Sequence, residues 1–303
     1  MKNQSKAYIF TAFSILCWAT VATAFKLALR YISPVQLLFV STLSSLIVLF
    51  SLAVVTGKLS KLKKFNQKEI FFSALMGLVN PFGYYLVLFQ AYAMLPAQIA
   101  QPLNVTWGIV IVFLSVPILR QKVRWQNFFS LVLAFLGVSL IAYGGEVSEY
   151  LNVSIAGILL ALSTSVIWSL YWLINAKDTQ DELLRLLLNF FFGAIYIVIF
   201  VLLNGSLVNF DMQGFWPAVY VGIFEMGLTF WFWLQALRYS ENTARISIYI
   251  YIFPVLSMGI IYMVLGEKIL FTSFIGLMLV ITGVLANKIL DSGPSRHQSK
   301  PKS

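Results

Sequence analysis

One carboxyl group stands alone in a long apolar stretch of the sequence. Glu225 is the single charged residue of the run VGIFEMGLTFWFWLQAL, which extends from Val221 to Leu237. On a helix, Gly222 and Thr229 would share its face, because they lie three residues before it and four after it. A charged residue at the centre of a bilayer costs about 2.5–3.5 kcal/mol on insertion scales. We therefore expect this stripe to face the interior of a helix bundle.

The chemistry open to Glu225 depends on whether it is protonated. Burial disfavours the charged form of a carboxyl group, so Glu225 could carry a coupling proton. If it stays ionised, it could instead hold the ammonium group of an amino acid. A structural alternative is a protonated Glu225 that only hydrogen-bonds a neighbouring helix. Ionisable residues inside membranes are functional by default, which favours the first two interpretations over the third.

Other polar and aromatic residues recur at helical spacing and could line a site for a small solute. Asn80 occupies the position that matches Glu225 at an offset of 145 residues. It shares a helical face with Tyr84, and Pro81, which follows it, should loosen the helix locally. The predicted substrate-binding residues are Trp18, Asn80, Tyr84, Gln101, Asn104, Trp107, Trp168, Tyr171, Glu225, Thr229 and Tyr251. Packing is the alternative for each Trp and Tyr, since both also form belts at membrane interfaces.

Several neighbouring positions have structural interpretations. Small residues recur every fourth position at Gly157, Ala161, Ser165 and Ser169. This stripe predicts a close contact between helices. Phe230, Trp231 and Trp233 should lie mostly to the sides of the Glu225 face. Lys26 lies near the end of its apolar run and can extend to the interface, whereas Glu267 should cap a helix or contact a turn.

The composition indicates a membrane protein. The chain has 303 residues, of which 60% are hydrophobic and 11% charged. A soluble domain averages about 45–50% apolar and about 25% charged residues, so a globule of this size could not bury so much apolar surface. The net charge of +10 comes from short clusters between apolar runs, which argues against nucleic acid as a partner. The single Cys17 cannot form an intrachain disulfide.

The apolar runs predict an all-α integral membrane protein. A helix needs about 20 residues to cross the hydrocarbon layer. Ten spans are predicted, at Ala7–Ala28, Pro34–Val55, Glu69–Tyr92, Gln98–Leu119, Asn127–Tyr143, Val153–Ile174, Leu183–Leu203, Phe215–Leu237, Ala244–Leu265 and Phe271–Leu290. The tail, residues 291–303, is short and polar and is expected to be disordered.

Positive residues give the orientation, because Lys and Arg stay on the cytoplasmic side. With the N-terminus inside, 18 of the 21 Lys and Arg residues fall at inner ends. Only Lys26, Arg30 and Lys268 fall at outer ends. We therefore predict a multi-pass protein of the cytoplasmic membrane with both termini in the cytoplasm.

The chain also carries signs of an internal repeat. Trp18 matches Trp168 at an offset of 150 residues. The segment LRQKVRWQNF matches LGEKILFTSF at an offset of 146 residues. These offsets predict two five-helix halves, residues 1–150 and 151–290. An odd number of spans per half forces the second half to insert upside down, and inverted repeats favour alternating access around a site near the midplane.

The sequence resembles the EamA family of the drug/metabolite transporter superfamily. Trp18 and Lys26 carry the resemblance in the first span. In the second half it is carried by the closing GLMLVITGVL and by the long segment GIFEMGLTFWFWLQALRYSENTARISIYIYIFPVLSMGIIYMVLGEKI. It is looser in the first half, where Gly108 replaces the repeat's Pro and Gln121 its Glu. NVTWGIVIVFLSVPILRQKVRW is similar to bacterial aromatic-amino-acid exporters. The resemblance implies a ten-helix carrier that exports amino acids or other small metabolites.

The competing classes have less support. An enzyme would need a nucleophile with a base, yet the only His, His297, lies in the predicted tail. The sequence shows no cluster for a metal and no Walker loop for ATP, so no cofactor is predicted. A carrier of another solute class, such as a nucleotide-linked sugar or a drug, and a channel stay open as alternatives. The predicted partners are a small-molecule substrate and the lipid bilayer, and a homodimer is open.

Overall fold

The structure is a computed structural model, and it describes residues 3–119, 132–133, 136–137, 140, 154–175, 178–207, 210–240, 249 and 252–291. Its long elements in the first half are α1 (Gln4–Leu29), α2 (Pro34–Val55), α3 (Gln67–Gly77), η2 (Leu78–Gly83), α4 (Tyr84–Met94), α5 (Ala97–Val105) and α6 (Trp107–Leu119). In the second half they are α8 (Ile155–Asn175), α9 (Glu182–Asn204), α10 (Phe215–Tyr220), η5 (Val221–Leu228), α11 (Thr229–Tyr239), α13 (Phe253–Leu265) and α14 (Phe271–Asp291).

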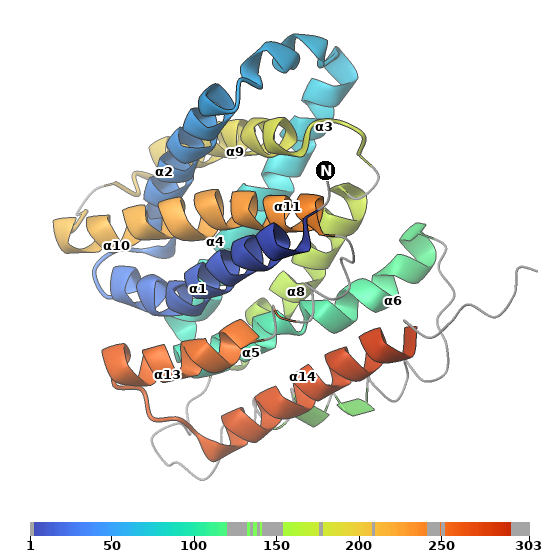
Figure 1. Cartoon of the computed structure of the whole chain (residues 1–303). Coiled ribbons are helices and arrows are strands. Elements are labelled where there is room, and N and C mark those ends of the chain that lie inside the picture. Colours follow the sequence, from blue (N-terminus) through green and yellow to red (C-terminus); the bar gives the residue numbers. More distant parts are fainter. Residues whose placement is uncertain are drawn as a thin grey trace, which may run out of the picture.

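The helices form one bundle (Figure 1). On one side α2 and α3 pack against α9, and on the other α13 and α14 lie beside α5 and α6. Between these groups run α1, α4, α8 and the continuous rod of α10, η5 and α11. The segments that carry Trp18, Asn80, Tyr84, Trp168, Tyr171, Glu225 and Thr229 are therefore at the centre of the bundle, and α5 and α6, which carry Gln101, Asn104 and Trp107, lie beside it.

Six helices of the described part are long and apolar enough to cross a membrane. They are Gln4–Leu29, Pro34–Val55, Gln67–Met94, Ile155–Asn175, Glu182–Asn204 and Met212–Tyr239. These confirm six of the predicted spans, and α2 has the predicted bounds. The predicted span Asn127–Tyr143, the start of the predicted ninth span and the tail lie mostly or wholly outside the described residues. The number ten stays a prediction.

Local sequence signals explain where several helices begin and end. Ser33 and Gln36 form a reciprocal capping box at the start of α2, where Pro34 is the first helical residue. Pro is favoured there because the first N–H has no helical partner anyway. Asn66 and Glu69 form the same box at the start of α3. These caps satisfy backbone N–H groups that the helix leaves free.

One predicted span is not a continuous helix. The run Gln98–Leu119 is divided at Thr106 into α5 and α6. The Thr106 hydroxyl donates to the Leu103 carbonyl at 2.7 Å, and Pro102 in the preceding turn has no N–H to donate. Local hydroxyl bonds of this kind compete with the helical ladder, and proline removes one of its hydrogen bonds. The predicted span is helical along most of its length, with this interruption at Thr106.

Two membrane-spanning runs depart from regular α-helix at their centres. The run is kinked at η2, which contains Asn80, whereas η5, which contains Glu225, is π-helical. Asn80 departs from helical geometry, with φ −147° and ψ 119°, just before Pro81. The predicted loosening of the third span is confirmed. π-Helical segments carry an extra residue per turn and are often found at functional sites.

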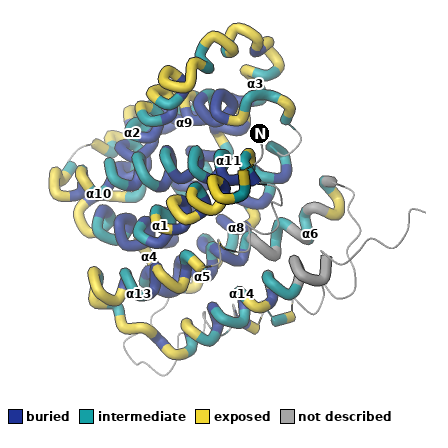
Figure 2. The backbone as a smooth tube through the Cα atoms, viewed as in Figure 1, coloured by how far each residue is buried: buried dark blue, intermediate teal, exposed yellow. Residues whose placement is uncertain are grey.

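Burial follows the pattern expected for a membrane bundle. The interior is lined by buried side chains, whereas exposed positions lie on the outer faces of the helices (Figure 2). Many exposed residues are large and apolar, among them Ile47 at 67%, Leu159 at 62% and Leu202 at 73%. Such a surface suits hydrocarbon as its solvent.

Small residues bring the helices close together. A Cβ atom at Gly222 would meet the Ser44 Cβ at 2.6 Å and the Ser41 Cα at 2.9 Å. At Gly157 it would meet the Leu95 Cγ at 2.8 Å, which confirms the predicted close contact along α8. Packing through small residues is the main source of helix association in membranes.

A valine at Gly222 is therefore expected to destabilise the bundle. Its side chain would have to displace backbone atoms of α2, and overpacking typically costs about 1–3 kcal/mol. Thermal unfolding in detergent measures the change. Gly259→Val is the matched control, because nothing lies within 4 Å of a Cβ atom at that position. Equal melting temperatures for the two variants would contradict this account of the α2 contact.

Candidate functional site

Glu225 lies in the bundle interior, as predicted. Its side chain is on η5 and the residue is 6% exposed. The Tyr85 hydroxyl of α4 donates to Glu225 Oε1 at 3.1 Å. The second oxygen, Oε2, has no hydrogen-bond partner within the described residues. Trp18 lies close enough to interact with the same carboxyl group. A buried acceptor without a partner is uncommon, and it leaves one oxygen of Glu225 open to a proton or a ligand.

Five aromatic side chains extend from Glu225 towards α8. We call Tyr84, Tyr85, Trp168, Tyr171 and Phe230 the aromatic cluster. The ring centroids of Tyr84 lie 4.8 Å from Tyr85 and 4.7 Å from Trp168. Trp168 lies 5.6 Å from Phe230 and 6.4 Å from Tyr171. The sequence did not predict Tyr85 as a site residue.

Amide groups fix the orientation of the cluster. Asn104 Nδ2 donates to the Tyr84 hydroxyl at 3.2 Å and to Thr164 Oγ1 at 2.7 Å. On the other side, Asn189 Nδ2 of α9 donates to the Tyr171 hydroxyl at 3.0 Å. Asn189 was missed by the sequence analysis, although a lone amide in the run LLLNFFF was a signal that could have found it.

Two further predicted residues are buried and incompletely bonded. Asn80 is 0% exposed, and neither its amide nitrogen nor its amide oxygen has a hydrogen-bond partner among the described residues. It lies beside Tyr171. Gln101 is 3% exposed, and its Oε1 atom is likewise unpartnered in the described part. Both amides retain hydrogen-bonding capacity that a bound solute could use.

The remaining predicted residues make other contacts. Trp18 packs 6.1 Å from Trp233 and 5.7 Å from Phe253. Trp107 is half-buried, and its carbonyl accepts a hydrogen bond from the Ser169 hydroxyl. Tyr251 lies outside the described residues.

Phe230 is not where the helical spacing predicted it. It is 1% exposed and belongs to the aromatic cluster, whereas the sequence placed it to the side of the Glu225 face. The π-helical turns of η5 explain the difference, because each extra residue rotates the following positions around the axis. The same shift lets the Thr229 hydroxyl donate to the Phe224 carbonyl, five residues earlier.

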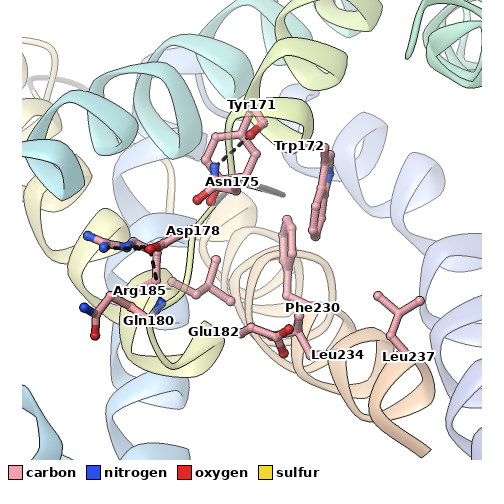
Figure 3. Close-up of a pocket in the computed structure, with 11 residues that line it drawn as sticks. Tyr171, Trp172, Asn175, Asp178, Gln180, Glu182, Arg185, Phe230, Leu234 and Leu237 are labelled. Atoms are coloured by element: carbon pink, nitrogen blue, oxygen red, sulfur yellow. Dashed lines mark hydrogen bonds and ion pairs between the residues drawn. The ribbon is translucent and has the colours of Figure 1, made fainter. Parts of the chain in front are cut away.

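A cavity of about 270 Å³ opens beside the aromatic cluster, where α8 ends and α9 begins (Figure 3). Tyr171, Trp172 and Phe230 form its aromatic wall. Asp178, Glu182 and Arg185 supply its charged groups. Figure 3 shows the Glu182 carboxyl group turned towards Phe230, while Arg185 turns towards Asp178. The cavity therefore leads from a charged mouth to the aromatic cluster.

Arg185 connects three elements at this end of the bundle. Its guanidinium donates to the Asp178 carboxylate through two nitrogens. Its third nitrogen donates to the Glu69 carbonyl and the Ser73 hydroxyl, both at 2.7 Å. The guanidinium also lies 5.1 Å from the Phe65 ring centroid. The guanidinium is thus committed to protein groups.

Contacts close the opposite end of the bundle. Lys26 Nζ donates to the Tyr92 and Leu95 carbonyls, both at 3.0 Å, instead of extending outwards as predicted. Glu267 accepts from the backbone N–H groups of Ala97 and Gln98, both at 3.2 Å. This confirms the predicted capping role of Glu267. The turn between α4 and α5 is therefore held by Lys26 of α1 and by Glu267, which follows α13.

Comparison with known proteins agrees with this architecture. Residues 5–143 and 155–287 match the model of the EamA-like transporter family. An uncharacterized transporter of Clostridium kluyveri is 25% identical over 93% of this chain and 93% of its own. The uncharacterized transporter YyaM of Bacillus subtilis is 26% identical over 94% of each chain. A solved crystal structure matches with a TM-score of 0.66 at 20% identity, covering 95% of this chain and 100% of the other, which shows a shared fold.

The apolar helices that surround a buried polar centre define a multi-pass membrane protein. Since the family match covers most of the sequence, the chain belongs to the EamA-like transporter family. It is a membrane transporter of small solutes. No group of three or more His, Cys, Asp or Glu side chains that could hold a metal occurs among the residues whose positions are described.

Proposed function

We propose that this protein exports amino acids, aromatic ones in particular, or similar small metabolites across the cytoplasmic membrane. Ten helices in two inverted halves, residues 1–150 and 151–290, would alternate access to a central site. Both termini would lie in the cytoplasm. The positions that the repeat offset pairs, Asn80 and Glu225, both lie where a membrane-spanning run departs from regular α-helix, which supports this symmetry.

The observation that carries the proposal is the unpartnered oxygen of Glu225 beside the aromatic cluster. Neighbouring aromatic faces suit the body of an aromatic solute, and buried amides suit its polar groups. Glu225 is assigned the coupling role, because a carboxyl group held away from water can bind and release a proton as its exposure changes. Trp18, Asn80, Tyr84, Gln101, Asn104, Trp107, Trp168, Tyr171, Thr229 and Tyr251 are assigned to substrate binding.

A cavity at one end of the bundle and side-chain contacts at the other end correspond to an inward-facing state of such a carrier. In the predicted topology, the cavity at the start of α9 faces the cytoplasm. The contacts of Lys26 and Glu267 then close the outer end. Export would begin with a solute entering this cavity and would end when those outer contacts open.

Uptake of labelled amino acids into proteoliposomes tests the proposal, with and without an acidic lumen. Saturable uptake of one class, faster with an acidic lumen and showing counterflow, is expected of a proton-coupled carrier. Empty liposomes are the control. Linear, non-saturating flux without counterflow would indicate a channel. Saturable uptake of nucleotide-linked sugars or drugs alone would replace the amino-acid assignment with another solute class.

A further inference from the structure

The charges at the site are unevenly distributed. At its buried end, Glu225 supplies a carboxyl oxygen with no partner among the described residues. At the cavity mouth, Glu182 forms no ion pair with any described Lys or Arg. Arg185 is bound to Asp178 and to two groups of α3. Two acidic groups are therefore candidates to meet a ligand: Glu182 in the cavity lining, and Glu225 deeper in the bundle beside Tyr85 of the aromatic cluster.

Three lysines of the described part have partners away from Glu225, although Lys58 and Arg238 lie near enough to Glu182 to interact with its charge. Lys26, on the same helix as Trp18, donates to two backbone carbonyls at the far end of the bundle. Lys58 and Lys61 pair with Asp181 outside the cavity lining. No described Lys or Arg contacts Glu225 or stacks on the aromatic cluster. Within the described residues, the surroundings of Glu225 therefore offer an anion for an ammonium group and no cation for a carboxylate, whereas the cation that lines the cavity, Arg185, is bound to Asp178.

The surroundings of Glu225 also favour a positive ligand. Aromatic faces attract cations through their quadrupoles, most strongly when water is excluded. Tyr84 is 3% exposed and Trp168 is 6% exposed, so a ligand beside them would be largely dehydrated. Unpartnered oxygens of Asn80 and Gln101 add further acceptors near this region. A dehydrated ammonium group needs such acceptors, because losing its water without replacement is costly.

We infer that the preferred substrate is an organic cation with an aromatic body, recognised through its ammonium group and without a requirement for a carboxylate. The inference rests on the proposed function of the same site. Glu182 acts first, drawing the cation to the cavity mouth. Glu225 and the aromatic cluster then hold it. An aromatic amine or amide of an amino acid meets this description, and a zwitterionic amino acid meets it only in part.

Ligand binding to the full-length purified protein in detergent tests the inference independently of transport. The probes are phenylalanine amide, phenylalanine and 3-phenylpropionate, whose aromatic bodies match but whose ammonium and carboxylate groups differ. Binding is followed by quenching of tryptophan fluorescence. Phenylalanine amide is expected to bind at least about tenfold more tightly than 3-phenylpropionate and no more weakly than phenylalanine, a difference of roughly 1.4 kcal/mol per tenfold.

Variants of the two carboxyl groups show which of them binds the ammonium group of phenylalanine amide. Glu225→Gln should weaken binding of the amide about tenfold or more, and Glu182→Gln should weaken it to a smaller extent that high salt removes. Glu182→Asp should retain the affinity. Asp211→Asn is the matched control, because Asp211 is an exposed carboxylate outside the cavity lining.

The outcomes separate this inference from the proposed function. Tighter binding of phenylalanine than of its amide would overturn the inference, because the site would then recognise a carboxylate. Equal binding of all three probes, or none, would overturn it as well. Saturable uptake of phenylalanine in proteoliposomes would leave the proposed exporter standing in each of those cases. Preferred binding of the amide with no transport of any solute would support the inference and contradict the carrier.

Discussion

Replacing Glu225 with Gln is expected to abolish the acceleration of uptake by an acidic lumen. The amide has nearly the same shape as the carboxyl group, and its oxygen can still accept the Tyr85 hydroxyl. It cannot bind and release a proton, so a pH gradient can no longer drive the transport cycle. Initial rates of solute uptake into proteoliposomes, with and without the gradient, give the result. Uptake with the gradient should fall to the rate without it.

The controls separate coupling from folding. The Glu225→Gln variant should unfold at a temperature equal to or above that of the unaltered chain, because a buried carboxyl group is replaced by a neutral one. The carboxylate of Asp211 lies outside the cavity lining, so Asp211→Asn should keep its gradient dependence. If the pH gradient accelerated the Glu225→Gln variant as strongly as the unaltered chain, the coupling role would belong to another group.

The sequence predicted the centre of the site because of a strong physical constraint. A single carboxyl group inside an apolar run must find the interior of the bundle, and Glu225 does so. Six spans could be predicted for the same reason, since hydropathy over about 20 residues reflects the thickness of the membrane. The position of Asn80 followed from the offset between the halves and from Pro81.

Other features depend on geometry that residue spacing does not contain. Phe230 belongs to the aromatic cluster and follows the π-helical η5, and a spacing of 3.6 residues per turn does not include the rotation that η5 introduces. Tyr84 and Tyr85 are adjacent, and the sequence alone does not show which of them faces the bundle interior, because that depends on how α4 packs. The same holds for Lys26, whose contacts with the turn between α4 and α5 require distant segments to meet.

Replacing Arg185 with Ala is expected to cause the largest loss of stability. Arg185 is 5% exposed, and its guanidinium binds Asp178, the Glu69 carbonyl and the Ser73 hydroxyl. Its removal leaves the Asp178 carboxylate without its cation and two acceptors of α3 without a donor. Breaking a buried pair from one side typically costs about 3–5 kcal/mol. Thermal unfolding in detergent measures the loss.

Two comparisons show whether this loss arises from burial and geometry. Lys58→Ala breaks the pair with Asp181, whose side chains are 20% and 18% exposed and so more accessible than the 6% of Arg185, and pairs that solvent reaches contribute only about 0–1 kcal/mol. Arg185→Lys keeps the charge but loses the paired hydrogen bonds to Asp178 and the planar contact with Phe65, so it should fall between the two alanine variants. If Arg185→Ala melted at the same temperature as Lys58→Ala, the guanidinium would not join α9 to α3. The cavity beside Arg185 could then widen without breaking a contact between α9 and α3.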